Sequence, residues 1–278
     1  MQHLDYSGPI GVFDSGYGGL TILREFQRTL PDYDYVYLGD NARAPYGSRS
    51  FDVIYRFTLE AVNELFARGC PLVILACNTA SAKALRTIQQ TDLPEIDPTR
   101  RVLGVIRPTI ESLPKHTRNG HIGLVGTTGT VNSRSYDLEI EKLYPDYRFS
   151  SHSCPMWVHL VENDEADKPG ADYFVRQEIN ALLRQDPEID SLILGCTHYP
   201  LLIKKIRQYL PPSVALIKQG EIVAESLADY LTRHPEMEQR ITRGGATTYL
   251  TTEDPAKFAP MASMFLAHTI EASQVLLG

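Results

Sequence analysis

The chain of 278 residues lacks the sequence features of exported and membrane-spanning proteins. Its first ten residues, MQHLDYSGPI, contain neither a basic region nor an apolar core. Its apolar runs are also far shorter than the roughly 20 residues that a transmembrane helix needs. We therefore expect the protein to stay in the cytoplasm and to have no membrane partner.

Clustered positive charge and the common cofactor motifs are missing as well. The formal net charge is -7, and no run of Lys or Arg exceeds two residues, which argues against nucleic acid as a ligand. The glycine-rich stretch FDSGYGGL at 13–20 fits neither of the common phosphate-binding patterns, GxGxxG and GxxxxGK[ST]. No lysine motif typical of pyridoxal phosphate enzymes is evident. The sequence thus predicts chemistry without a cofactor.

Cysteine is scarce, and no two cysteines have CxxC spacing. The chain has four, Cys70, Cys77, Cys154 and Cys196, and we expect free thiols in a reducing compartment. His198 follows Cys196 by two residues, and Cys77 could be a third zinc ligand, but a second close Cys/His pair and a fourth ligand are not evident, so we expect no metal. Cys70 and Cys154 are interpreted as small buried apolar residues. Cys77 and Cys196 differ, because each follows a predicted strand and precedes polar residues.

Short β-like runs alternate with helix-length amphipathic segments, the pattern of parallel sheets with crossover helices. We expect strands at 10–13, 34–38, 72–75, 102–106, 121–125, 191–194, 214–217 and 247–251. The length suits two domains. Because the segments 91–101 and 209–216 are rich in proline, we expect the chain to cross between domains there. The predicted fold class is therefore α/β, with a first domain over 1–100 plus 213–278 and a second over 101–212.

A faint internal repeat relates the two predicted domains. Segment 10–16 (IGVFDSG) resembles 122–128 (IGLVGTT), and 72–79 (LVILACNT) resembles 191–198 (SLILGCTH). Each domain therefore places one cysteine just past a buried strand, at the sheet edge where open parallel sheets bind ligands. Two such domains facing each other would bring the two cysteines to opposite walls of one cleft.

Thiols at strand-to-helix junctions can act as acids and bases. A helix N-terminus offers N–H groups that lower a thiol pKa from about 8.5 toward neutrality. At the same edge, Asp14 could orient a thiol or accept from a substrate ammonium group, and the amides of Gly47 and Ser48 could bind a carboxylate. We expect His198 to tune the thiol of Cys196.

A series of ordered motifs resembles one family, the glutamate racemases of the cofactor-independent aspartate/glutamate racemase superfamily. The motifs are GPIGVFDSGYGGLTIL, LGDNARAPYGSRS, LACNTASAKAL, GLVGTTGTV, LGCTHYPLL and YLTTEDPAKFAPMASMFL, and they span nearly the whole chain. The resemblance implies two α/β domains related by a pseudo-twofold axis, with mostly parallel sheets and the active site between them. It also implies interconversion of L-glutamate and D-glutamate, which supplies D-glutamate for peptidoglycan synthesis.

Carried over residue by residue, the resemblance implies that Cys77 deprotonates D-glutamate and Cys196 deprotonates L-glutamate. Asp14 would assist Cys77, whereas Glu162 and His198 would assist Cys196. The implied substrate contacts are Asp14, Ser15, Pro45, Tyr46, Gly47, Ser48, Cys77, Asn78, Thr79, Cys196, Thr197 and His198. We expect a homodimer, and the sequence leaves open whether the chain binds DNA gyrase, as some family members do.

The sequence departs from the family pattern at two places. Arg107 and Thr109 stand where many relatives have an acid followed by Pro-Gly, and Lys218 and Gln219 stand where many have Asp-Ser. These departures bear on regulation, interdomain contact and oligomeric arrangement rather than on the reaction. Two alternatives stay open: another thiol enzyme, such as an aspartate or hydantoin racemase, or a protein that binds an acidic amino acid without turnover. Two retained cysteines argue against the latter, since binding alone needs neither.

Overall fold

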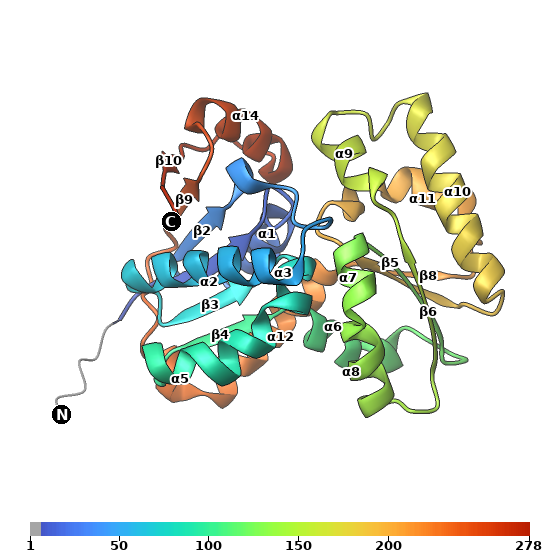
Figure 1. Ribbon diagram of the computed structural model, residues 1–278. Helices are drawn as coiled ribbons and strands as arrows, with labels where there is room; N and C mark the ends of the chain where they lie inside the picture. Colours follow the sequence, from blue (N-terminus) through green and yellow to red (C-terminus); the bar gives the residue numbers. More distant parts are fainter. Residues whose placement is uncertain (1–6) are drawn as a thin grey trace.

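Two parallel β-sheets organise the computed structural model, which describes residues 7–278 (Figure 1). The six-stranded sheet has the order β10-β9-β2-β1-β3-β4, and the four-stranded sheet has the order β6-β5-β7-β8. The strands are β1 Ile10–Asp14, β2 Tyr35–Gly39, β3 Leu72–Leu75, β4 Arg101–Gly104, β5 His121–Gly126, β6 Arg148–Ser153, β7 Ser191–Gly195, β8 Ala215–Ile217, β9 Thr247–Thr251 and β10 Ser273–Gln274. Every pairing between these strands is parallel, which confirms the α/β fold class expected from the sequence.

Helices connect the strands and flank both sheets (Figure 1). They are α1 Leu20–Thr29, η1 Asn41–Arg43, α2 Phe51–Ala67, α3 Asn78–Lys83, α4 Leu85–Thr87, η2 Ile88–Asp92, α5 Leu93–Ile96, α6 Ile106–Glu111, η3 Leu113–Lys115, α7 Thr128–Ser133, α8 Ser135–Leu143, α9 Met156–Glu162, α10 Pro169–Gln185, η4 Tyr199–Leu202, α11 Ile203–Tyr209, α12 Gln219–Arg233, α13 Pro235–Glu238 and α14 Pro255–Leu266. In α2, the buried residues Ile54, Thr58, Ala61 and Leu65 recur every three or four positions, which is the period of one helix face. None of the helices in the described part of the chain is long and apolar enough to cross a bilayer.

The central strands are buried along their whole length. Strands β1, β2, β3 and β7 have no exposed residue, as expected for parallel strands covered on both faces. One hydrophobic cluster continues from the first sheet to the second, because it contains Val12 of β1 as well as Val125 of β5 and Leu194 of β7. The two domains therefore share apolar packing in addition to two chain crossings.

The strand order confirms the internal repeat. The order β2-β1-β3-β4 in the first sheet matches β6-β5-β7-β8 in the second. The repeat segments correspond to β1 with β5 and to β3 with β7, each with its following loop. Each domain therefore offers the same two strand ends to the space between the sheets.

The domain boundaries differ from the sequence-based ones by a few residues. Strand β4 begins at Arg101 but pairs with β3 in the first sheet, and β8 ends at Ile217 but pairs with β7 in the second. By sheet membership, the boundaries predicted after residues 100 and 212 are therefore both too early. The chain crosses first through α6 and returns through α12, which packs against α1.

Candidate active site

Cys77 lies between the end of β3 and the start of α3. It is the N-cap residue of α3, and its Sγ accepts from the backbone N–H of Ala80 at 3.5 Å. The hydroxyl oxygen of Ser15, which follows β1, lies 3.4 Å from the same sulfur. Since β1 and β3 are neighbours in a parallel sheet, their carboxyl ends bring the thiol and the hydroxyl together.

Cys196 lies at the equivalent place in the second sheet, directly after β7. Its Sγ is 3.8 Å from Nδ1 of His198, and Nε2 of His198 is 2.9 Å from Oε1 of Glu162 at the end of α9. His198 is only 5% exposed. The structure thus places a thiol, an imidazole and a carboxylate in a row, with the imidazole shielded from water.

Both cysteines line one small pocket between the two sheets. Its lining consists of Ser15, Ala44, Pro45, Tyr46, Gly47, Cys77, Asn78, Thr79, Thr127, Val158, Glu162, Cys196, Thr197 and His198. The structure therefore brings together most of the site residues expected from the sequence. Asp14 and Ser48 are the exceptions, because Asp14 is fully buried behind the lining and Ser48 is exposed outside it.

Asp14 supports the loops that form the pocket. Its carboxylate accepts from the backbone N–H of Gly16 at 3.0 Å and from the hydroxyl of Thr197 at 3.4 Å. Burial raises the pKa of Asp14, while the nearby His198 and these hydrogen bonds act in the opposite direction. Asp14 does not line the pocket, but it accepts a hydrogen bond from Thr197, which does.

Gly18 allows a close approach between the two domains. A Cβ atom at this position would lie 2.2 Å from Oγ1 of Thr197 and 2.6 Å from Nδ1 of His198. The glycine-rich loop after β1 therefore packs directly on the loop that carries Cys196. The absence of a side chain at Gly18 serves this contact rather than phosphate binding.

The two thiols have different electrostatic surroundings. Burial, followed by the negative charge of Asp14, raises the pKa of Cys77 to about 12, although hydrogen bonds from Ser15 and Ala80 act against the shift. The sequence-based expectation that a helix N-terminus would lower this pKa is wrong, because desolvation outweighs a single N–H donor. At neutral pH, Cys77 is therefore a thiol.

His198 supplies the positive charge on the other side of the pocket. Burial alone lowers the pKa of His198, but its hydrogen bonds to Cys196 and Glu162 outweigh burial and raise the pKa to about 10. At neutral pH this residue is an imidazolium cation 3.8 Å from the sulfur of Cys196. A cation at that distance stabilises a thiolate. The pocket thus holds a neutral thiol on one wall and, on the other, the sulfur of Cys196 beside a cation.

Hydrogen bonds hold the loop that carries the expected substrate contacts at residues 45–48. The hydroxyl of Tyr46 donates to the carboxylate of Asp40, which also accepts from Nε of Arg43 at 2.7 Å. The carbonyl oxygen of Gly47 accepts from the N–H of Gly129 in the second domain at 2.7 Å. The loop therefore bridges the domains and closes one side of the pocket.

Sequence reasoning missed Thr127, whose hydroxyl lies 2.9 Å from that of Thr79. The repeat contained the signal, because Thr127 occupies the position equivalent to Ser15. Ala44 and Val158, also missed, had no such signal. Glu162 lies in an acidic run that is normally a solvated face, so only the family resemblance pointed to it.

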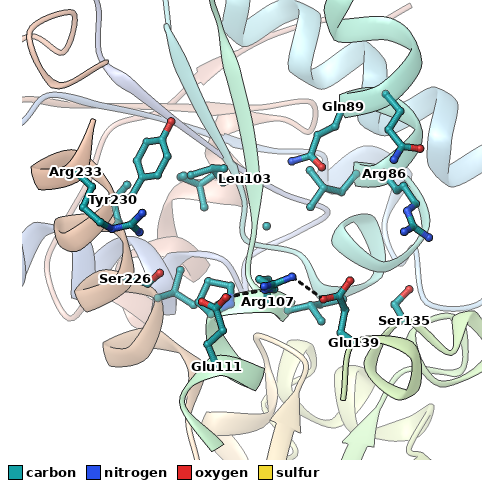
Figure 2. Close-up of a pocket in the computed structure, with 18 residues that line it drawn as sticks. Arg86, Gln89, Leu103, Arg107, Glu111, Ser135, Glu139, Ser226, Tyr230 and Arg233 are labelled. Carbon is teal, nitrogen blue, oxygen red and sulfur yellow. Dashed lines mark hydrogen bonds and ion pairs between the residues drawn. The ribbon is translucent and has the colours of Figure 1, made fainter. Parts of the chain in front are cut away.

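A larger pocket lies between β4, α6, α8 and α12, and Figure 2 shows the residues around it. No cysteine or histidine lines this pocket. Arg107 crosses it with ion pairs to Glu111 at 2.7 Å and to Glu139 at 3.1 Å. Within residues 7–278, no group of three or more His, Cys, Asp or Glu side chains is arranged to hold a metal ion. Cys77, Cys196 and His198 thus all line the smaller pocket and not this one.

Comparison with known proteins gives consistent results. A family model described as Asp/Glu/Hydantoin racemase matches residues 13–227. The chain is 42% identical over 271 residues to a glutamate racemase of Ruegeria sp. (strain TM1040), covering 94% of this chain and 97% of the relative. A crystal structure of glutamate racemase isoform RacE1 from Bacillus anthracis matches with a TM-score of 0.88 and 34% identity over 98% of both chains. The structure of a Francisella tularensis glutamate racemase in complex with D-glutamate matches with a TM-score of 0.85 and 31% identity, covering 99% of this chain and 98% of the other.

Proposed function

The chain belongs to the Asp/Glu/hydantoin racemase family and interconverts L-glutamate and D-glutamate, and we propose that Cys77 and Cys196 are its two acid/base groups. The observation that carries this proposal is the pair of thiols on opposite walls of one pocket, each at the end of an equivalent strand. Racemisation needs a base on one face of the α-carbon and an acid on the other. A single thiol would not provide both.

The protonation states of the two sides fit the reaction of L-glutamate. Cys196, beside the His198 imidazolium, takes the α-proton as a thiolate. Cys77 then returns a proton to the opposite face as a thiol. After one turnover the protonation states are reversed, which is the arrangement that D-glutamate requires. Glu162 and His198 thus assist on the Cys196 side, and Asp14 acts on the Cys77 side through its negative charge, which raises the pKa of that thiol.

Removal of the α-proton builds negative charge beside a carboxylate, so hydrogen-bond donors must surround that carboxylate. The pocket provides hydroxyls from Ser15, Thr79 and Thr197 and a side-chain amide from Asn78. We propose these residues as substrate contacts, together with Pro45, Tyr46, Gly47 and His198. Ser48 stays a predicted contact, made through its backbone N–H.

The test is a set of cysteine variants assayed by circular dichroism with each enantiomer. Cys77→Ala and Cys196→Ala should each abolish racemisation. Cys70→Ala and Cys154→Ala are matched controls, because both thiols are fully buried outside the pocket and should cost only about 1 kcal/mol of stability. Racemisation near the parental rate by either pocket variant would show that the two-thiol assignment is wrong.

The remaining expectations come partly from the family resemblance and partly from the sequence itself. Supply of D-glutamate for peptidoglycan synthesis is the role of this family. The homodimer, the cytoplasmic location and the lack of any cofactor are carried over as proposals. Light scattering of the purified protein at several concentrations tests the dimer.

A further inference from the structure

Two of the residues that depart from the family pattern contact each other at the crossings between the domains. Thr109 lies on α6 in the first crossing, and Gln219 is the first residue of α12 after the second crossing. Nε2 of Gln219 donates to Oγ1 of Thr109 at 2.9 Å. Both residues are buried, at 0% exposure for Thr109 and 3% for Gln219, so this contact is shielded from water.

Thr109 determines which way the amide of Gln219 faces. The hydroxyl of Thr109 donates its only hydrogen to the carbonyl oxygen of Val105 at 2.7 Å. Toward Gln219 this hydroxyl can therefore only accept, which requires the NH2 group of Gln219 on that side. The carbonyl oxygen Oε1 of Gln219 consequently points the other way, toward Asn78.

Asn78 is in turn held by two contacts in a closed ring of hydrogen bonds. Its Nδ2 donates to Oε1 of Gln219 at 2.6 Å, and its Oδ1 accepts from the hydroxyl of Tyr136 at 2.7 Å. Gln219 closes the ring by donating from Nε2 to the hydroxyl of Tyr136 at 2.9 Å. The ring uses one of the two hydrogens on Nδ2 of Asn78 and leaves the other without a partner in the ring.

Asn78 lines the pocket next to Cys77, so the remaining hydrogen is a donor at the active site. We propose that Gln219, oriented by Thr109, is a positioning residue that holds Asn78 with this N–H directed to a carboxylate of bound glutamate. This inference rests on the proposed function of the cysteine pocket. The ring joins α3 of the first domain, α8 of the second and both crossings, so the donor is aligned only while the domains keep this arrangement.

A double-mutant cycle tests whether Gln219 acts through Asn78. Gln219→Met, Asn78→Ala and the double variant are compared with the parent by kcat/KM for both enantiomers. Where turnover is too slow, the Kd for D-glutamate from calorimetry replaces it. Gln219→Met keeps the length of the side chain and removes its hydrogen bonds, so we expect kcat/KM to fall on the order of tenfold. In the Asn78→Ala background, Gln219→Met should change kcat/KM less than about twofold.

Two further comparisons separate positioning from general destabilisation. Thr109→Val should reproduce the effect of Gln219→Met, whereas Thr109→Ser keeps the hydroxyl and should retain parental activity. Gln89→Met is the matched control, because the amide of Gln89 donates to Val102 at 2.7 Å away from the cysteine pocket. This control should leave kcat/KM unchanged.

If Gln219→Met lowered kcat/KM equally in the parent and in the Asn78→Ala variant, the positioning role would be overturned. Parental activity of Asn78→Ala would overturn it as well. Neither result touches the proposed function, which fails only if Cys77→Ala or Cys196→Ala remains active. The two hypotheses are therefore tested separately.

Discussion

Cys77 and Cys196 occupy equivalent positions in the repeat but have different neighbours. Two residues after Cys77 stands Thr79, and two residues after Cys196 stands His198. His198 brings a positive charge to one thiol, whereas Cys77 has only the hydroxyl of Ser15 and one backbone N–H. The symmetry of the fold thus supplies two thiols, and this one pair of unlike residues makes their electrostatic surroundings differ.

The raised pKa of His198 leads to a prediction about stability. In the folded protein this pKa is about 10, compared with 6.5 for an ordinary histidine. The folded state therefore keeps a proton that the unfolded state loses above about pH 6.5. The stabilisation of the folded state by His198 is complete below that pH and is lost as the pH rises toward 10. The free energy of unfolding by urea, measured from pH 7 to pH 10, should fall less steeply for His198→Asn than for the parent.

The control for this prediction is His234→Asn, because the side chain of His234 is 38% exposed and lies outside the pocket. This variant should keep the parental pH dependence. Identical slopes for His198→Asn and the parent would mean that His198 is neutral in the folded protein. In that case the proposed thiolate at Cys196 would lose its cation.

For single residues, the sequence predicted which side chains lie together in the pocket, but not their pKa values. Cys77, Ser15 and Cys196 could be found because each follows a strand of the repeat. The pKa of Cys77 could not be predicted, because it depends on how completely the folded chain excludes water from the thiol. Glu162 could not be found from local sequence either, since its partner His198 is 36 residues away.

Among the structural elements, the loop after β1 has the tightest geometric requirement. Gly18→Ala would place a Cβ atom 2.2 Å from Oγ1 of Thr197, so the loop that carries Cys196 and His198 would have to move. Shifts of about 1 Å in a catalytic group can reduce rates a hundredfold. We therefore expect kcat/KM for both enantiomers to fall by roughly tenfold or more in a steady-state assay.

Gly170→Ala is the matched control, because a Cβ atom at Gly170 would have no neighbour within 4 Å. Its activity should be parental. Parental activity of Gly18→Ala would show instead that the two loops need not approach so closely for turnover.

The elements themselves were predictable where their hydrophobic pattern was strong. The buried strands β1, β2, β3 and β7 lie within a residue or two of their predicted positions. Strand β6, RFSSHS, was missed because it lies at the sheet edge and has few apolar residues. Strand β10 was missed because it has only two residues, both exposed.

The domain boundaries were misplaced because proline-rich segments mark turns, whereas sheet membership depends on pairing between distant residues.

In the whole molecule, each domain contributes one of the two cysteines that line the pocket. The first sheet carries Cys77 and the second carries Cys196, and the pocket forms only where the two sheets face each other. Figure 1 shows α3 beside α7 at this junction, and the hydroxyls of Thr79 and Thr127 lie 2.9 Å apart there. The two chain crossings, tied together through Thr109 and Gln219, keep this arrangement. Opposed thiols follow from the repeat, whereas the contact between the two crossings comes from Thr109 and Gln219, which lie outside it.

Transfer of deuterium from solvent tests the account of two opposed thiols most directly. L-Glutamate is racemised in D2O, and deuterium at the α-carbon of both enantiomers is followed by mass spectrometry after chiral separation. In the proposed mechanism Cys196 removes the proton and Cys77 delivers a different one, so D-glutamate should carry deuterium from the earliest time points while recovered L-glutamate stays mostly unlabelled. Equal early labelling of both enantiomers would contradict the account, since it would indicate a single base acting on both faces.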